Sequence, residues 1–336
     1  MNESLKNEPA PRKKPSIKSI ASMVLFLALI VWLGVYIWEN RAEMTQMLQL
    51  SWPLIAGMLL LALGTCLVNC LYHLVILRTF SLPLTLTDWM GVVFVSNSMA
   101  YVLPMRADLV FTATYYKRAK GLAYTKSVSM VAGNIVFGVA FSLLQIFVAL
   151  LCIGLLDGEW PGTLWVLLIL GTAILTVFIV LTLFFQNRMP AFLQKVKIVT
   201  DVTEGFVSLL RNKAMLWQLL GCMIGGNLFR LLLYMVCFHT IGQPVTFYES
   251  LFFSSVSWLA SVVAIVPGNI GIAEGAMGVA ALLLGRFSDV AMTAVSLLHR
   301  VAIMVIYLAV GAVFAIPVYR RFTGRKAVSC ELEDEG

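Results

Sequence analysis

Charged residues are scarce in this sequence: Lys, Arg, Asp and Glu make up only 12% of its 336 residues, whereas 60% are hydrophobic. Soluble globular domains carry about 25% charged residues, so this composition excludes an ordinary soluble domain. Several apolar runs reach the length of about 20 residues that a helix needs to cross a bilayer. The sequence therefore predicts a helical membrane protein with several spans.

Motifs for nucleotide-driven or nucleophilic chemistry are missing as well. The sequence has no Walker A loop, no nucleophile elbow and no metal-binding helix of the His-Glu-x-x-His type. We therefore expect a protein that is not an enzyme and that uses no cofactor. An intramembrane enzyme with Glu274 and His299 as acid and base is the weakest alternative, because nothing supplies a nucleophile or a metal.

The six cysteines show no spacing typical of a disulfide framework, and almost all lie within apolar segments. Cys66, Cys70 and His73 share one helix face, which is the arrangement of three metal ligands. A fourth ligand is missing, so we expect these side chains to form a packed helix–helix contact. No metal site is predicted.

Basic residues predict the topology, because Lys and Arg gather on the cytoplasmic side of membrane proteins. Most of the 24 Lys and Arg residues fall into a few segments between the apolar runs. This pattern predicts a disordered basic tail at 1–19, one transmembrane domain at 20–318 and a charged tail at 319–336, with both termini cytoplasmic. The expected location is the inner membrane of a bacterium or an archaeon. Topology and anionic lipids explain the net charge of +7, so we expect no nucleic-acid partner.

Two apolar runs are interrupted by proline and have both ends on one side of the membrane. The breaks fall at Pro104 and Pro267, which lie 267 − 104 = 163 residues apart. Each break predicts a re-entrant hairpin between two full helices, so the halves 53–156 and 215–316 match but enter from opposite sides. The predicted fold is an all-α polytopic membrane protein with six full transmembrane helices plus two re-entrant broken hairpins in an inverted repeat.

The second break lies in the stretch 263–278, which holds a proline, four glycines and a carboxylate inside apolar sequence. Interrupted backbone at membrane depth must be buried in protein or line a wet cavity. We therefore expect a substrate-binding site near the bilayer midplane. The alternative is a kinked helix whose carboxylate is neutral or paired. The candidate residues here are Pro267, Gly268, Asn269, Gly271 and Glu274.

Arg106 and Asp108 directly follow the first break. A guanidinium in a low-dielectric cavity suits a lipid phosphate, because its planar fork makes two charge-assisted hydrogen bonds at once. The alternative is an internal ion pair between Arg106 and Asp108. Both residues are candidates for substrate binding.

His299 and Arg300 lie within the last apolar run, 290–316, and complete the set of candidates. Arg300 suits either a phosphate or an ion pair with Glu274, and the pair is favoured because two lone buried charges are costly. Two alternative roles for Glu274 are binding the cationic part of a headgroup and taking up a proton during transport. Arg230, one turn after Asn227, is interpreted as a helix–helix tie, with a role as a ligand as the less favoured alternative.

Two motifs resemble those of a known family. Leu103-Pro104-Met105-Arg106-Ala107-Asp108 is similar to Leu-Pro-Gly-Arg-x-Gly-Glu, and the stretch from Pro267 to Glu274 resembles Pro-Gly-Gly-x-Gly-x-x-Glu. Arg300 falls where that family has an arginine. The family is the lysylphosphatidylglycerol synthetase transmembrane region, the membrane half of the multiple peptide resistance factor. The resemblance covers roughly residues 20–320, and the chain departs from it at Met105 and at Gly133-Asn134.

The resemblance implies a lipid translocase, a flippase or scramblase that moves aminoacyl-phosphatidylglycerol or another anionic or zwitterionic phospholipid between leaflets. No aminoacyl-transferase domain is expected in this chain, which ends at 336. Alternatives are translocation of polyprenyl-phosphate-linked sugars, secondary transport of a small anionic solute, and a non-catalytic membrane partner of a glycosyltransferase or lipid-modifying synthase. Membrane lipids are the expected partners, and a homodimer stays open.

Overall fold

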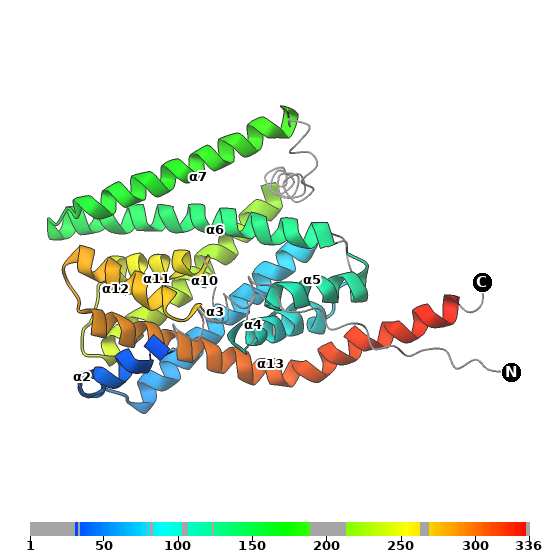
Figure 1. Cartoon of the computed structure of the whole chain (residues 1–336), viewed down its shortest axis with the longest axis horizontal. Coiled ribbons are helices and arrows are strands. Elements are labelled where there is room, and N and C mark those ends of the chain that lie inside the picture. The colour runs from blue at the N-terminus through cyan, green and yellow to red at the C-terminus, as the bar shows by residue number, and fades with distance from the viewer. Residues whose placement is uncertain are drawn as a thin grey trace.

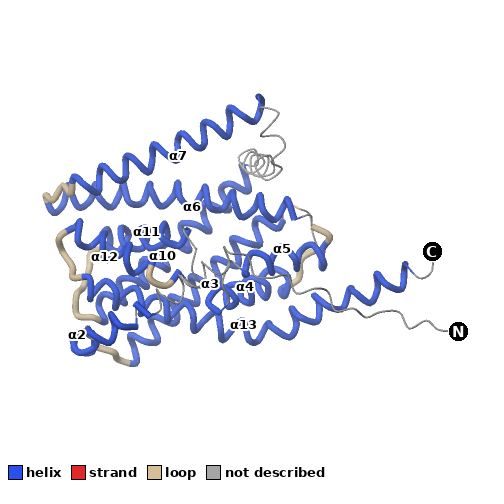
Figure 2. The backbone as a smooth tube through the Cα atoms, viewed as in Figure 1, coloured by secondary structure: helices blue, strands red, loops and turns tan. Residues whose placement is uncertain are grey.

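The computed structural model describes residues 31–32, 34–78, 80, 83–102, 107–122, 124–188, 213–262 and 269–333. All regular elements in these ranges are helices, joined by short loops (Figures 1 and 2). The predicted basic tail at 1–19 and the break residues Pro104 and Pro267 lie outside them.

Long apolar helices form the body of the molecule. Within the described residues, four stretches are long and apolar enough to cross a membrane: Trp52–Arg78, Ile135–Asp157, Lys213–Thr240 and Asp289–Thr323. They belong to the helices α3 (Trp52–Arg78), α6 (Tyr124–Cys152, continued by a π-helical turn, η2, Ile153–Asp157), α10 (Lys213–Thr240) and α13 (Asp289–Glu333). These runs contain no proline beyond the first turn of a helix, with Pro317 of α13 as the exception. The chain at 319–333, predicted as a charged tail, continues α13 as helix.

Two pairs of shorter helices lie toward opposite ends of the bundle (Figure 1). The first pair consists of α4 (Val92–Val102), which directly continues the π-helical turn η1 (Thr87–Gly91), and α5 (Ala107–Lys120). The second pair consists of α11 (Phe247–Val262) and α12 (Ile272–Leu284). The partners of each pair pack against each other. On either side of the residues that are not described, α4 ends at Val102 and α5 begins at Ala107, and α11 ends at Val262 and α12 begins at Ile272. The remaining described helices are α2 (Arg41–Met47) and α7 (Gly162–Arg188), and α7 runs beside α6.

The packing crosses between the two halves of the sequence. Helix α3 packs against α10, α4 packs against α13, and α11 packs against α6. Glycines allow the close approach: a Cβ on Gly311 of α13 would collide with the Ser98 side chain of α4, and one on Gly138 of α6 would collide with Trp258 of α11. Cys66 and Cys70 of α3 are fully buried, as expected for residues at a helix contact.

A buried carboxylate begins each helix pair. Asp88 accepts hydrogen bonds from the backbone N–H of Thr85 (2.9 Å) and from its hydroxyl (2.8 Å). Lys120, at the end of α5, forms a 2.7 Å ion pair with Asp88, and Arg321 of α13 contributes a second cation at 3.3 Å. Burial raises the pKa of Asp88, but the bonds from Lys120, Thr85 and Tyr115 outweigh this effect and lower it to about 2. The two arms of the first pair are thus tied at their base.

Glu249 is the buried carboxylate that joins the two ends of the second pair, α11 and α12, in the same way. It accepts hydrogen bonds from the backbone N–H of Thr246 (2.8 Å) and from its hydroxyl (2.7 Å). Arg286, just after α12, pairs with Glu249 at 2.7 Å and also with Asp157 (2.7 Å) and Glu159 (2.9 Å). One guanidinium therefore joins the base of this pair to the loop between α6 and α7.

Candidate substrate cavity

The start of α12 is built around Glu274. Asn269 and Gly271 both have positive φ values, 58° and 83°, so the backbone turns sharply before the helix begins. The Glu274 carboxylate then accepts a 2.8 Å hydrogen bond from the Gly271 N–H, which caps the helix. The Glu274 residue is only 2% exposed. The carboxylate therefore has a structural task before any ligand is considered.

The second oxygen of Glu274 is also occupied. It lies 2.7 Å from Nη2 of Arg300, and the Ser296 hydroxyl donates to it at 3.4 Å. The same Arg300 nitrogen donates to the carbonyl oxygen of Asn269 at 3.2 Å. The ion pair that the sequence favoured is present, and it links α12 to α13. The second terminal nitrogen of Arg300 and the side-chain amide of Asn269 have no hydrogen-bond partner within the described ranges.

His299 faces a different neighbour. Its ring stacks on Tyr234 of α10 with 4.4 Å between centroids, and its Nε2 atom is buried without a partner among the described residues. In the part of the chain that the structure describes, Glu274 bonds to Gly271, Ser296 and Arg300 and not to His299. The ring of His299 is therefore held against α10, whereas the Glu274 carboxylate is held between α12 and α13.

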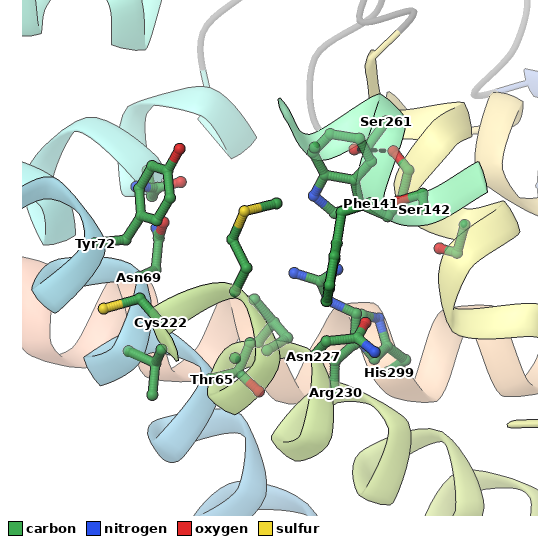
Figure 3. A pocket seen from close by; sticks show the side chains of 18 of the residues that line it. Thr65, Asn69, Tyr72, Phe141, Ser142, Cys222, Asn227, Arg230, Ser261 and His299 are labelled. Carbon is green, nitrogen blue, oxygen red and sulfur yellow. Dashed lines mark hydrogen bonds between the residues drawn. The ribbon is translucent and has the colours of Figure 1, made fainter. Parts of the chain in front are cut away.

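A polar cavity of about 370 Å³ lies between six helices, α3, α4, α6, α10, α11 and α13. Its walls come from both halves of the sequence. Figure 3 shows the side chains gathered around it. The polar lining residues are Thr65, Asn69, Tyr72, Asn97, Tyr101, Ser142, Gln145, Asn227, Arg230, Ser257, Ser261, His299 and Tyr307. Such a concentration of polar groups within apolar helices indicates a path or site for a polar molecule.

Hydrogen bonds between helices hold the cavity walls in place. Asn69 donates to the Tyr307 hydroxyl at 3.0 Å, which joins α3 to α13. Ser255 donates to the Gln145 side chain at 2.9 Å, which joins α11 to α6, and Ser98 donates to the backbone oxygen of Tyr307 at 2.7 Å. The cavity is therefore bordered by fixed polar groups.

Arg230 is the cationic residue of the cavity lining. Figure 3 shows it on the wall with Asn227 and His299 nearby. It lies close enough to Tyr234 and Tyr307 for electrostatic interaction, yet it forms no hydrogen bond or salt bridge with the residues described here. The helix–helix tie predicted from the sequence is thus not seen within these residues, because the guanidinium borders the cavity.

The remaining predicted site residues fall in other places. Arg106, Pro267 and Gly268 lie outside the described residues. Asp108 is partly buried in the first turn of α5, and the described cavity lining does not include it. Among the candidates, His299 borders the cavity itself, while Asn269, Gly271, Glu274 and Arg300 form one connected cluster.

Sequence reasoning missed most of the cavity. The polar residues Asn69, Asn97, Tyr101 and Tyr307 were not recognised, although each is a polar residue within an apolar helix. The rule that intramembrane polar residues face the bundle interior would have selected them together with Arg230. The candidate residues were instead selected because they lie close to the prolines in the sequence, and this selected the cluster around Glu274 and Arg300.

Apolar helices of bilayer-spanning length around a polar cavity define a polytopic helical membrane protein. The family model described as "Lysylphosphatidylglycerol synthase TM region" matches residues 19–311. The chain belongs to this family, which confirms the resemblance seen in its two motifs and indicates a role related to membrane lipids. Searches of curated proteins and of solved structures found no match.

Proposed function

We propose that this protein is a membrane lipid translocase, a flippase or scramblase. A phospholipid headgroup passes through the polar cavity while the acyl chains remain in the bilayer. The observation that carries this proposal is the cavity of about 370 Å³ with its polar lining from six helices. Polar groups at membrane depth are costly unless they serve a polar substrate or a wet pathway.

An apolar groove supports a substrate with a hydrocarbon part. The groove has a volume of about 380 Å³ and is bordered by α6, α7, α11 and α12. Two of its helices, α6 and α11, also border the polar cavity. An amphipathic lipid matches a protein in which a polar and an apolar compartment share the same pair of helices. A small soluble anion would need only the polar compartment.

An inverted repeat supports transport through the cavity. In this proposal the chain has six full spans and two re-entrant hairpins, α4 with α5 and α11 with α12, with both termini in the cytoplasm of a bacterial or archaeal cell. The ties at the hairpin bases support it: Thr246 follows Thr85 by 246 − 85 = 161 residues, and Glu249 follows Asp88 by 249 − 88 = 161. The crossed packing of each hairpin on the last helix of the other half agrees with a two-fold relation.

The transported lipid is an aminoacyl-phosphatidylglycerol or another anionic or zwitterionic phospholipid in this proposal. The alternatives are a polyprenyl-phosphate-linked sugar, a small anionic solute, and a non-catalytic role beside a glycosyltransferase or lipid-modifying synthase. A homodimer is compatible with each of them.

A translocation assay in proteoliposomes tests the proposal. Cys222 borders the cavity, whereas Cys152 lies outside its described lining, and both are partly exposed. We expect the wild-type protein to move labelled phosphatidylglycerol faster than empty liposomes. Cys222→Trp fills the cavity and should slow this movement at least about tenfold, which corresponds to roughly 1.4 kcal/mol; the matched variant Cys152→Trp should not.

Two results would contradict the proposal. Wild-type protein that moves no lipid above the empty-liposome rate refutes translocase activity for the lipids tested. A folded Cys222→Trp variant that transports at the wild-type rate refutes the cavity as the pathway.

A further inference from the structure

The described residues that line the cavity carry charge of one sign only, which is positive. Arg230 contributes a cation, and the described lining contains no Asp or Glu. An anion entering the cavity therefore meets a guanidinium and no competing carboxylate among the described lining residues.

The nearby carboxylate does not compensate Arg230. Both oxygens of Glu274 are used by Gly271, Ser296 and Arg300. Glu274 is 2% exposed and is not part of the described cavity lining. Its charge is neutralised by Arg300 across the α12–α13 contact, so Glu274 does not serve as the counter-ion of Arg230 within the described residues.

A guanidinium that has no ion-pair partner among the described residues of these apolar helices is costly, and a bound anion offsets that cost. Arg230 has the geometry for this task, because its planar fork donates two parallel hydrogen bonds to phosphate oxygens. The side-chain amide of Asn227 lies one helical turn away on the same wall and adds neutral donors (Figure 3). A monoanionic phosphodiester matches this combination of one cation and neutral donors.

We infer that Arg230 binds the phosphate of the transported headgroup, so that the cavity selects a net-anionic phospholipid such as phosphatidylglycerol over an aminoacylated lipid with net positive charge. This inference rests on the proposed translocase function and narrows its substrate. A lysyl headgroup brings ammonium groups that find no free carboxylate in the described lining, and their repulsion from Arg230 opposes binding.

Lipid binding to the purified full-length protein in detergent, followed by native mass spectrometry, tests the inference apart from transport. The probes are short-chain phosphatidylglycerol, phosphatidylcholine and lysyl-phosphatidylglycerol. We expect the wild type to bind phosphatidylglycerol most tightly. Arg230→Gln should weaken that binding by roughly 10- to 100-fold, the range for a lost charge-assisted hydrogen bond.

Two further variants keep the result interpretable. Arg320→Gln removes the same charge from an exposed position on α13 and should leave the affinity unchanged. Arg230→Lys keeps the charge without the fork, so its loss should be smaller than that of Arg230→Gln, and it replaces that variant if the latter does not fold. Equal affinity of wild type and both Arg230 variants overturns the inference, as does tighter wild-type binding of the lysyl lipid.

A soluble competitor separates a lipid from a free anion. Glycerol phosphate should not displace phosphatidylglycerol at equal concentration; if it does, the site serves a soluble phosphate ester and the lipid assignment is overturned. The translocation assay with the same variants separates the two levels of the proposal. Binding that depends on Arg230 without lipid movement refutes the translocase alone, whereas movement that is insensitive to Arg230→Gln refutes the phosphate site alone.

Discussion

The ion pair between Glu274 and Arg300 makes a quantitative prediction. The substitution Glu274→Gln keeps an oxygen that can accept the Gly271 N–H, so the helix cap survives, but the charge opposite Arg300 is lost. The two groups lie 2.7 Å apart with side-chain exposures of 1% and 12%. Breaking a buried pair from one side costs about 3–5 kcal/mol, because the remaining charge stays buried alone.

The expected loss lies near the lower end of that range. Arg300 keeps its hydrogen bond to the Asn269 carbonyl oxygen, and its other terminal nitrogen already lacks a partner among the described residues. We therefore expect Glu274→Gln to lower the free energy of unfolding by about 3 kcal/mol. The double variant Glu274→Gln/Arg300→Met should recover at least about 1 kcal/mol of that loss, because it removes the uncompensated charge.

The measurement is reversible unfolding in mixed micelles of the wild type, both single variants and the double variant. Glu159→Gln is the control, because the Glu159 side chain is 54% exposed and its bond to Arg286 should contribute less than about 1 kcal/mol. A Glu274→Gln variant as stable as the control, with no coupling to Arg300, would refute the structural role assigned to the pair. Lipid transport by the folded double variant then shows whether Glu274 has a role in transport beyond this tie.

Two further predictions concern other contacts. The pKa of Asp88 is about 2, against an ordinary 3.8, so this carboxylate contributes roughly 2 kcal/mol of stability above pH 4 that is lost as the pH falls toward 2. The free energy of unfolding, measured from pH 6 to pH 2, should therefore fall with pH in the wild type and fall less in Asp88→Asn. Gly311→Ala should destabilise the protein by about 1–3 kcal/mol, because the new Cβ meets the Ser98 side chain and lies 3.1 Å from the Phe94 carbonyl oxygen. Gly221→Ala is its control, since nothing lies within 4 Å of a Cβ there, and equal melting temperatures of the two glycine variants would contradict the close α4–α13 packing.

The local features of the fold were predictable from the sequence. Long apolar runs predict helices by length and composition alone. The interruptions predicted at Pro104 and Pro267 lie outside the described residues and stay predictions. The pair between Glu274 and Arg300 was predictable for a similar reason: so few charges lie within apolar sequence that an acid and a base there are each other's natural partners.

The rule that polar residues face the bundle interior selects several residues of the cavity lining, but the sequence does not show that their helices meet around one cavity. Helix α10 is apolar on nearly all sides, so no periodic pattern indicates which of its faces meets other helices and which faces lipid. The position of Arg230 depends on how α10 packs against α3 and α13, and the contacts that set this packing join residues far apart in the sequence. The helix through 319–333, predicted as a tail, continues α13 without a new start signal.

An ion pair joins the two helices of each short pair at one end, and this restricts where the two helices can separate. Lys120 and Arg286 fasten the end of one arm to the start of the other, so the two arms cannot separate at that end without exposing a buried carboxylate, Asp88 or Glu249. Within the described residues, any separation of the two helices of a pair must therefore begin away from this end, where no buried carboxylate has to lose its cation.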